Sequence, residues 1–153
     1  MKKFTKVCRF SAIVGAALLM AACSSTGFKA DDVPASMAMG AGANLSGAHE
    51  VPANASKASG SSTIWVAANK SVSGKVNISG MTPTMAHIHE AAAGANGKVI
   101  ITLTKVSDEL FEVPDGATLT ASQYASYMAG NLYVNVHSAA YPGGEIRVQL
   151  SPK

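Results

Sequence analysis

The sequence predicts a mainly β domain that contains one short helix. From about residue 44 onward, short runs of alternating apolar and polar residues are separated by Gly, Pro, Asn and Ser, a pattern typical of antiparallel strands joined by turns. The chain has 153 residues, about the length of one domain. Because 48% of the residues are hydrophobic and only 6% are aromatic, the core must consist mainly of aliphatic side chains, and a disordered or collagen-like chain is excluded.

The alternation predicts strands over seven segments. They are Ser62–Ala68, Ser73–Ser79, Ala86–Glu90, Lys98–Thr104, Asn131–His137, Glu145–Leu150 and, near the start of the domain, Met39–Ser46. The segment 119–130 breaks this pattern and predicts the helix, near residues 121–129. Thr120 is followed three residues later by Gln123, which fits a capping box, and Gly130 can end the helix.

The last two predicted strands are expected to form a hairpin whose polar residues share one face. A pairing in which residue numbers sum to about 282 places Asn135 opposite Arg147 on that face. His137 then lies opposite Glu145 on the same face, and the alternate apolar residues point to the core.

The N-terminus has the organisation of a secretory signal. Four basic residues precede an uncharged apolar run, Phe10–Ala22, whose 13 residues are too few to span a bilayer as a helix. The run ends in Leu19–Ser24, where two small residues stand directly before Cys23, and this resembles a bacterial lipobox. The resemblance implies a lipoprotein signal peptide over residues 1–22 and acylation of Cys23. Lipoproteins retained in the inner membrane usually carry Asp directly after the lipidated cysteine. Ser24 at this position therefore favours sorting to the outer membrane of a bacterial cell envelope.

Cleavage of the signal changes the charge and the cysteine content of the chain. Without the signal's four basic residues, eight of the 12 remain against nine acidic ones, so the net charge becomes −1 instead of +3. No basic stripe then supports a nucleic-acid partner, and no cysteine remains for a disulfide. Residues 23–43, rich in Ser, Ala, Gly and Met, are expected to be a flexible tether. In the alternative, ordinary secretion, Cys23 stays a free thiol.

Histidines are the main candidates for chemistry in this sequence. His87 and His89 are two residues apart in one predicted strand, so their side chains share a face and can converge on one metal ion. His137 lies on the polar face of another strand, and imidazole ligands suit copper or zinc. His49, in a loop at a strand end, is a less secure ligand, and Glu145 is expected beside His137 as a support for the site. The alternative is that these histidines are structural or simply exposed.

The sequence lacks the motifs of covalent catalysis. It has no G-x-S-x-G nucleophile motif, and Ser138 would point to the opposite face of the strand from His137. The spacing of Glu50, Glu90 and Glu145 does not favour paired-carboxylate chemistry. The sequence therefore predicts a protein that is not an enzyme.

Three segments resemble the CHRD domain, a family named after chordin and widespread in bacterial secreted proteins. They are Leu45–Pro52, Ala86–His89 and Gly130–Arg147, of which the last is long and specific. The resemblance implies a CHRD domain over residues 44–153 with a Greek-key-type β-sandwich, immunoglobulin-like or copper/zinc superoxide dismutase-like. His49 stands where the family usually has Gln, Glu90 where Gly is usual, and Val148 where a second Gly is common.

The likeness to superoxide dismutase is limited to the order of the histidines. In that fold an H-x-H strand and a later V-H strand supply copper ligands, and His87, His89 and His137 are similar in order. The chain lacks the zinc loop, the bridging histidine and the disulfide of that fold, so dismutase activity is not expected.

Two hypotheses for function follow from the sequence. In the first, the protein is anchored to outer-membrane lipid through Cys23 and binds copper or zinc through its histidines. In the second, it is a non-catalytic adhesion or protein-interaction module whose histidines are structural, with an unknown protein partner.

Replacement of the lipidated residue tests the anchor. We expect Cys23→Ser to abolish membrane anchoring and to leave soluble protein or uncleaved precursor, because no other segment of the mature chain is apolar enough to hold a bilayer. Fractionation with detergent partitioning measures the effect. A processed Cys23→Ser protein that stays in the membrane would contradict the lipoprotein hypothesis.

Overall fold

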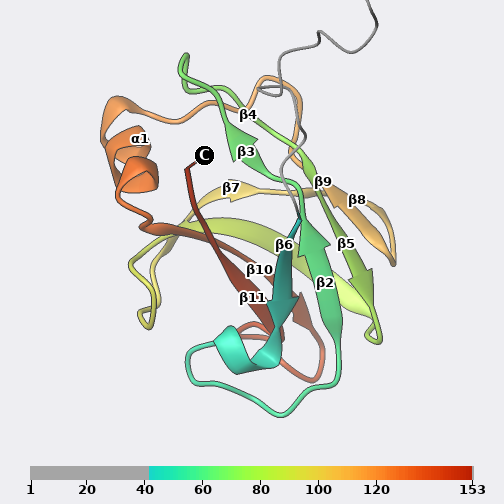
Figure 1. Cartoon of the computed structure of the whole chain (residues 1–153). Helices are drawn as coiled ribbons and strands as arrows, with labels where there is room; N and C mark the ends of the chain where they lie inside the picture. The colour runs from blue at the N-terminus through green and yellow to red at the C-terminus, as the bar shows by residue number, and fades with distance from the viewer. Residues whose placement is uncertain (1–41, 153) are drawn as a thin grey trace, which may run out of the picture. The chain divides into compact units, whose positions relative to one another are not determined.

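The structure is a computed structural model that describes residues 42–152. The strands, labelled in Figure 1, are β1 Ala43–Ser46, β2 Ser59–Ser62, β3 Trp65–Val66, β4 Val72–Ser73, β5 Lys75–Ser79, β6 Pro83–Glu90, β7 Lys98–Thr102, β8 Thr104–Ser107, β9 Leu110–Glu112, β10 Leu132–Ser138 and β11 Ile146–Leu150. The helices are the short 3-10 turn η2, Gly47–His49, and the α-helix α1, Ala121–Met128. The described part of the chain is therefore mainly β with one α-helix, which confirms the predicted fold class.

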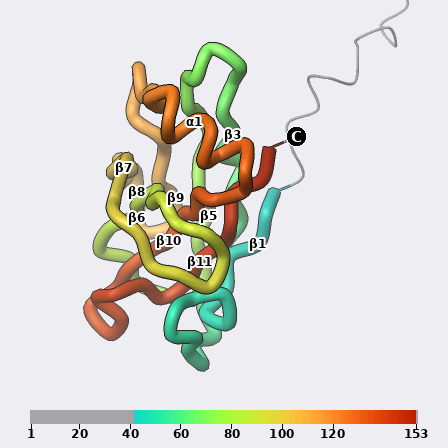
Figure 2. Tube along the Cα trace, turned by 90° about the vertical axis from the view of Figure 1, so that its left-hand side faces the viewer, coloured from blue at the N-terminus to red at the C-terminus, as the bar shows by residue number. Residues whose placement is uncertain are grey.

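Nine of the strands form one curled antiparallel sheet. Its order is β7-β6-β10-β11-β1-β2-β5-β9-β8, so the neighbours β6 and β10, and also β11 and β1, are far apart in the sequence, as in a Greek key. The two edge strands, β7 and β8, belong to one continuous segment joined at Leu103, whose backbone N–H donates to the carbonyl of Ala86 at 2.9 Å. Because one segment supplies both edges, the sheet is nearly closed and resembles a β-sandwich (Figures 1 and 2).

Strand β10 lies between β6 and β11 in this sheet and is buried along its whole length. Leu132, Val134 and Val136 face the hydrophobic core, which they share with residues of several other strands and of α1. The polar residues of β10 point to the other face, which loops cover. α1 and the β3–β4 hairpin lie at one end of the sheet, and the loops after β1 and β10 lie at the other (Figure 2).

The predicted hairpin and helix are both present. β10 pairs with β11 in the expected register, with Asn135 opposite Arg147. The Thr120 hydroxyl accepts a hydrogen bond from the backbone N–H of Gln123 at 3.2 Å, and the Gln123 side chain accepts one from the backbone N–H of Thr120 at 2.8 Å, which completes the capping box. Gly130 follows the helix with a φ of +73°, a conformation that glycine adopts without strain.

Some predicted strand boundaries are wrong. The segment Ser62–Ala68 is not one strand, because β2 ends at Ser62, whose hydroxyl accepts a hydrogen bond from the N–H of Ile64. The next predicted strand is interrupted at Gly74, whose φ of +116° breaks the extended backbone. Strand β9, Leu110–Glu112, was not predicted, since three residues are too few to show an alternation.

Several predictions fall outside the described residues. These are the signal peptide over residues 1–22, the lipidated Cys23 and nearly all of the predicted tether, whose last residue, Ala43, is the first residue of β1. Between residues 42 and 152, no helix has the length and apolar character needed to cross a membrane.

Candidate metal centre

The polar face of β10 continues onto the neighbouring strand β6. In the β6–β10 ladder His87 lies opposite Asn135, and His89 lies opposite Tyr133, so all four side chains point to the same face as His137. The alternate residues of both strands point to the core instead. Two strands that are distant in the sequence thus bring three histidines to one surface of the sheet.

These three histidines converge, as the sequence predicted. One ring nitrogen from each of His87, His89 and His137 lies within 4.8 Å of one from each of the others. The ring centroids are 4.9 Å apart for His87 and His137, 5.6 Å for His87 and His89, and 6.3 Å for His89 and His137. His89 and His137 are buried and His87 is half-buried, so the cluster reaches the surface at His87.

Loop carbonyl groups determine which nitrogens are free to bind a metal ion. Nδ1 of His89 donates to the carbonyl of Gly97 at 3.0 Å, and Nδ1 of His137 donates to the carbonyl of Pro142 at 3.0 Å. A carbonyl oxygen can only accept, so both rings carry their proton on Nδ1 and have a lone pair on Nε2. This arrangement is the one that orients histidine ligands in metal sites.

The free nitrogens have spacings and surroundings that fit a metal ion. Nε2 of His89 is buried and has no hydrogen-bond partner, which is uncommon for a buried polar atom. Nε2 of His137 lies 3.0 Å from Nδ1 of His87, close to the roughly 3 Å that separates two nitrogens bound to one ion at about 2.0–2.1 Å. In the metal-free protein His87 donates to His137 through this contact, so binding at Nδ1 requires His87 to move its proton to Nε2.

Burial favours the neutral form of two of the three rings. It lowers the pKa of His87 below the usual 6.5, and the neighbouring imidazoles of His137 and His89 lower it further. Burial also lowers the pKa of His137, although its hydrogen bond to Pro142 opposes this shift. Neutral imidazole is the form that binds metal ions, so both rings are ready to act as ligands.

Tyr133 and Arg147 fix one side of the cluster. The Tyr133 ring stacks on His89 with centroids 4.7 Å apart and an interplanar angle of 2°. The Arg147 guanidinium lies 3.4 Å from the centre of the Tyr133 ring. Because β10 lies between β6 and β11, the Tyr133 ring is held between His89 of β6 and Arg147 of β11. The Tyr133 hydroxyl also accepts a hydrogen bond from the backbone N–H of Gly97 at 3.3 Å, beside the carbonyl that holds His89. The alternation of the sequence predicts that Tyr133 lies on the polar face. Its position between His89 and Arg147 follows only from the order of the strands in the sheet.

His49 and Glu145 do not belong to the histidine cluster. His49 is exposed, and its Nδ1 donates to the backbone carbonyl of Arg147 at 3.2 Å. Glu145 is buried, and its carboxylate accepts hydrogen bonds from the hydroxyls of Ser138 and Ser56, the latter at 2.6 Å. Glu145 therefore supports the site only indirectly, by joining the end of β10 to the loop before β2.

A buried carboxyl group, which the sequence analysis weighed only for paired-carboxylate chemistry, lies on the same side of the sheet. Glu50 is 5% exposed, and its Oε1 has no hydrogen-bond partner. Burial raises the pKa of Glu50, whereas a hydrogen bond from Asn135 and the charge of Arg147 lower it. A side chain at Gly144 would collide with this carboxyl group, so the glycine allows the loop after β10 to close over Glu50.

Comparison with known families places nearly all of the described residues in one family model. Residues 41–150 match the family model of the CHRD domain. The chain belongs to the CHRD family. Neither the curated proteins nor the solved structures include a match to it.

Glu90 continues the strand that carries His87 and His89. β6 extends to Glu90, which pairs with Leu132 and with Lys98. The Glu90 carboxylate accepts a hydrogen bond from the Ser126 hydroxyl at 2.7 Å and lies 3.1 Å from the Lys98 ammonium group. Glu90 thereby ties α1 to the strand that holds His87 and His89.

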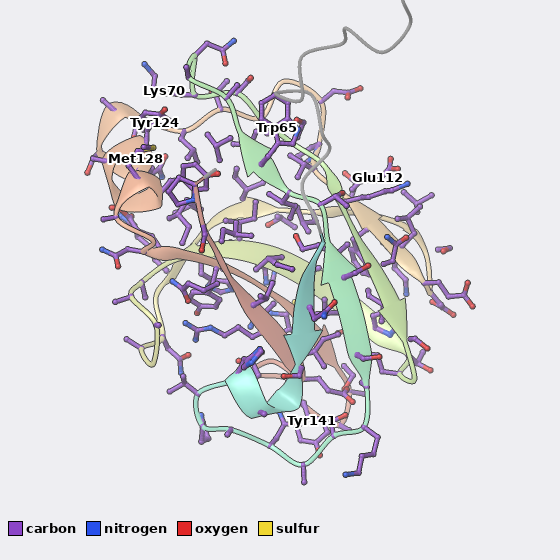
Figure 3. All side chains as sticks on the ribbon, in the orientation of Figure 1. Trp65, Lys70, Glu112, Tyr124, Met128 and Tyr141 are labelled. Carbon is purple, nitrogen blue, oxygen red and sulfur yellow. The ribbon has the colours of Figure 1, made fainter. Side chains whose placement is uncertain are left out.

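The contacts of Glu145 predict a stabilising role. Glu145→Ala leaves two hydroxyls without their acceptor, so we expect the free energy of unfolding to fall by about 1–3 kcal/mol and the loop after His137 to loosen. Chemical denaturation measures the loss, with Glu112→Ala as the control. Glu112 is exposed on β9 (Figure 3), and its removal should change stability by less than about 0.5 kcal/mol. Equal stability of the Glu145→Ala protein and the wild type would refute this role.

Proposed function

We propose that this CHRD domain binds a copper or zinc ion through His87, His89 and His137. The observation that supports the proposal most is the buried, unpartnered Nε2 of His89. A histidine with a purely structural role would have both nitrogens satisfied, because leaving a buried polar atom unpaired costs about 1–3 kcal/mol. A metal ion bound by the three rings removes that cost.

The donor set favours copper and zinc over harder ions. Within the described residues, the converging group consists of imidazoles and includes no carboxylate. Calcium and magnesium prefer oxygen ligands, whereas imidazole suits zinc and copper. The ligands stand on two paired strands and two of them are held by loop carbonyls, so they need little ordering on binding.

We also propose that the domain acts in the bacterial cell envelope as a lipid-anchored binding protein rather than as an enzyme. The basis is the sequence around Cys23, which resembles a lipobox and would attach the protein to outer-membrane lipid. The residues up to Gly42 would then separate the domain from the membrane, leaving the histidine cluster accessible to metal ions in the surrounding solution.

A protein-interaction module is the second candidate. It is favoured by the bonds from His89 and His137 to the carbonyls of Gly97 and Pro142, because these would also hold two surface loops in place without any metal ion. In that case the loops would be the functional surface and the histidines their supports. The two proposals differ in whether removal of the histidines changes metal affinity.

Substitution of single histidines tests the metal site. We expect His87→Ala, His89→Ala and His137→Ala each to weaken Zn(II) and Cu(II) binding by at least about tenfold, because each removes one ligand. Isothermal titration of the protein with each ion measures this. His49→Gln is the matched control and should change affinity less than about twofold, since His49 is exposed and outside the cluster. If the triple alanine variant binds both ions as tightly as the wild type, the interaction module becomes the better explanation.

Acid should release the bound ion. Protons compete with the metal for the imidazole nitrogens, so affinity falls as pH falls. Because burial lowers the pKa of both His87 and His137, we expect the loss below about pH 6.5, the usual value for histidine. Zn(II) titrations between about pH 7.5 and about pH 4.5 measure the midpoint. A midpoint above about pH 6.5 would show that these two rings do not control binding.

A further inference from the structure

We propose that Met85 completes the histidine site as a thioether ligand and that the ion it selects is Cu(I). This inference rests on the proposed metal site and narrows it to one metal and one oxidation state. Met85 lies on β6, two residues before His87, and no sequence motif drew attention to it.

The ladder places Met85 beside the histidines. Met85 is directly opposite His137 in the β6–β10 pairing, so the two side chains point to the same face with Cβ atoms about 4.5–5.5 Å apart. The same alternation puts Met85 on the face of His87, while Ala86 between them points to the core. A methionine side chain has three rotatable bonds and can bring its sulfur to a ligand bound by these neighbours.

The exposure of the residues along β6 indicates where a further ligand can enter. His89 is 7% exposed, His87 is half-buried, and Met85 is 46% exposed. The buried side of the cluster is occupied by the stacked ring of Tyr133, so the open side of the cluster is the one on which Met85 lies. The backbone ladder shifts by one residue directly beyond the Met85–His137 pair, at a β-bulge, which is a common device for redirecting side chains beside functional sites.

The combined donor set matches the chemistry of Cu(I). Thioether sulfur is a soft ligand that selects Cu(I), whereas Zn(II) gains little from it. Three neutral imidazoles and a thioether carry no negative charge, and no carboxylate joins the converging group in residues 42–152. An uncharged site compensates a monovalent ion in a partly buried position more easily than a divalent one.

Substitution of Met85 by leucine separates this proposal from the general metal site. Met85→Leu keeps the size and apolar character of the side chain but removes the sulfur. The matched control is Met128→Leu, because Met128 is 53% exposed on α1, at the end of the fold away from the loop of Tyr141 (Figure 3). Both are made in the full chain carrying Cys8→Ser and Cys23→Ser and purified in detergent, so that no thiolate competes for copper.

The affinities for Cu(I), kept reduced with ascorbate, and for Zn(II) are measured by competition with a chromophoric chelator. We expect Met85→Leu to weaken Cu(I) binding by about tenfold or more and to change Zn(II) binding by less than about twofold. Met128→Leu should leave both unchanged. X-ray absorption of the Cu(I) protein should show a copper–sulfur path that Met85→Leu removes.

Each outcome decides one of the two proposals. Unchanged Cu(I) affinity and an unchanged copper–sulfur path in Met85→Leu would overturn the role of Met85, even if Zn(II) still binds through the histidines. An equal loss of Cu(I) and Zn(II) affinity would also overturn it, because it would indicate a structural role. If the His87/His89/His137 triple alanine variant binds both ions like the parent chain, the histidine site itself is refuted.

Discussion

The structure depends on the burial of strand β10 on both faces. One face presents Leu132, Val134 and Val136 to the core, so the other face carries polar side chains that must find partners without water. Those partners come from the neighbouring strands β6 and β11 and from loop backbones. The position of these loops and the tautomers of the histidines are consequences of this requirement.

The loops satisfy this polar layer almost completely. Gly97 and Pro142 accept from His89 and His137, and Ala95 accepts from the Arg147 guanidinium at 3.0 Å. The layer still has unpaired atoms, since Nε2 of His89, Oδ1 of Asn135 and Oε1 of Glu50 have no hydrogen-bond partner. Among these three atoms, only Nε2 of His89 lies in a group of ring nitrogens that could share one metal ion. The potential metal ligands are therefore gathered at one point of this surface.

The sequence predicts the local features of the fold better than the distant ones. The hairpin register and the capping box follow from residues close in the chain, and both are confirmed. The joining of both sheet edges by the segment around Leu103 could not be predicted, because it depends on how the sheet curls. The break at Gly74 was missed for another reason: a glycine in an alternating run looks the same whether its φ is negative or positive.

In the candidate site, too, the sequence predicts the features set by nearby residues but not those set by distant parts of the chain. Alternation gives the face of His87, His89 and His137, but their convergence depends on the pairing of β6 with β10, about fifty residues later in the chain. No alternation within one strand predicts which loop carbonyl will hold a ring nitrogen. Yet those carbonyls keep the lone pairs on Nε2, and so turn an H-x-H pattern into a possible ligand set. The proposed metal site therefore depends as much on the loops at Gly97 and Pro142 as on the strands that carry the histidines.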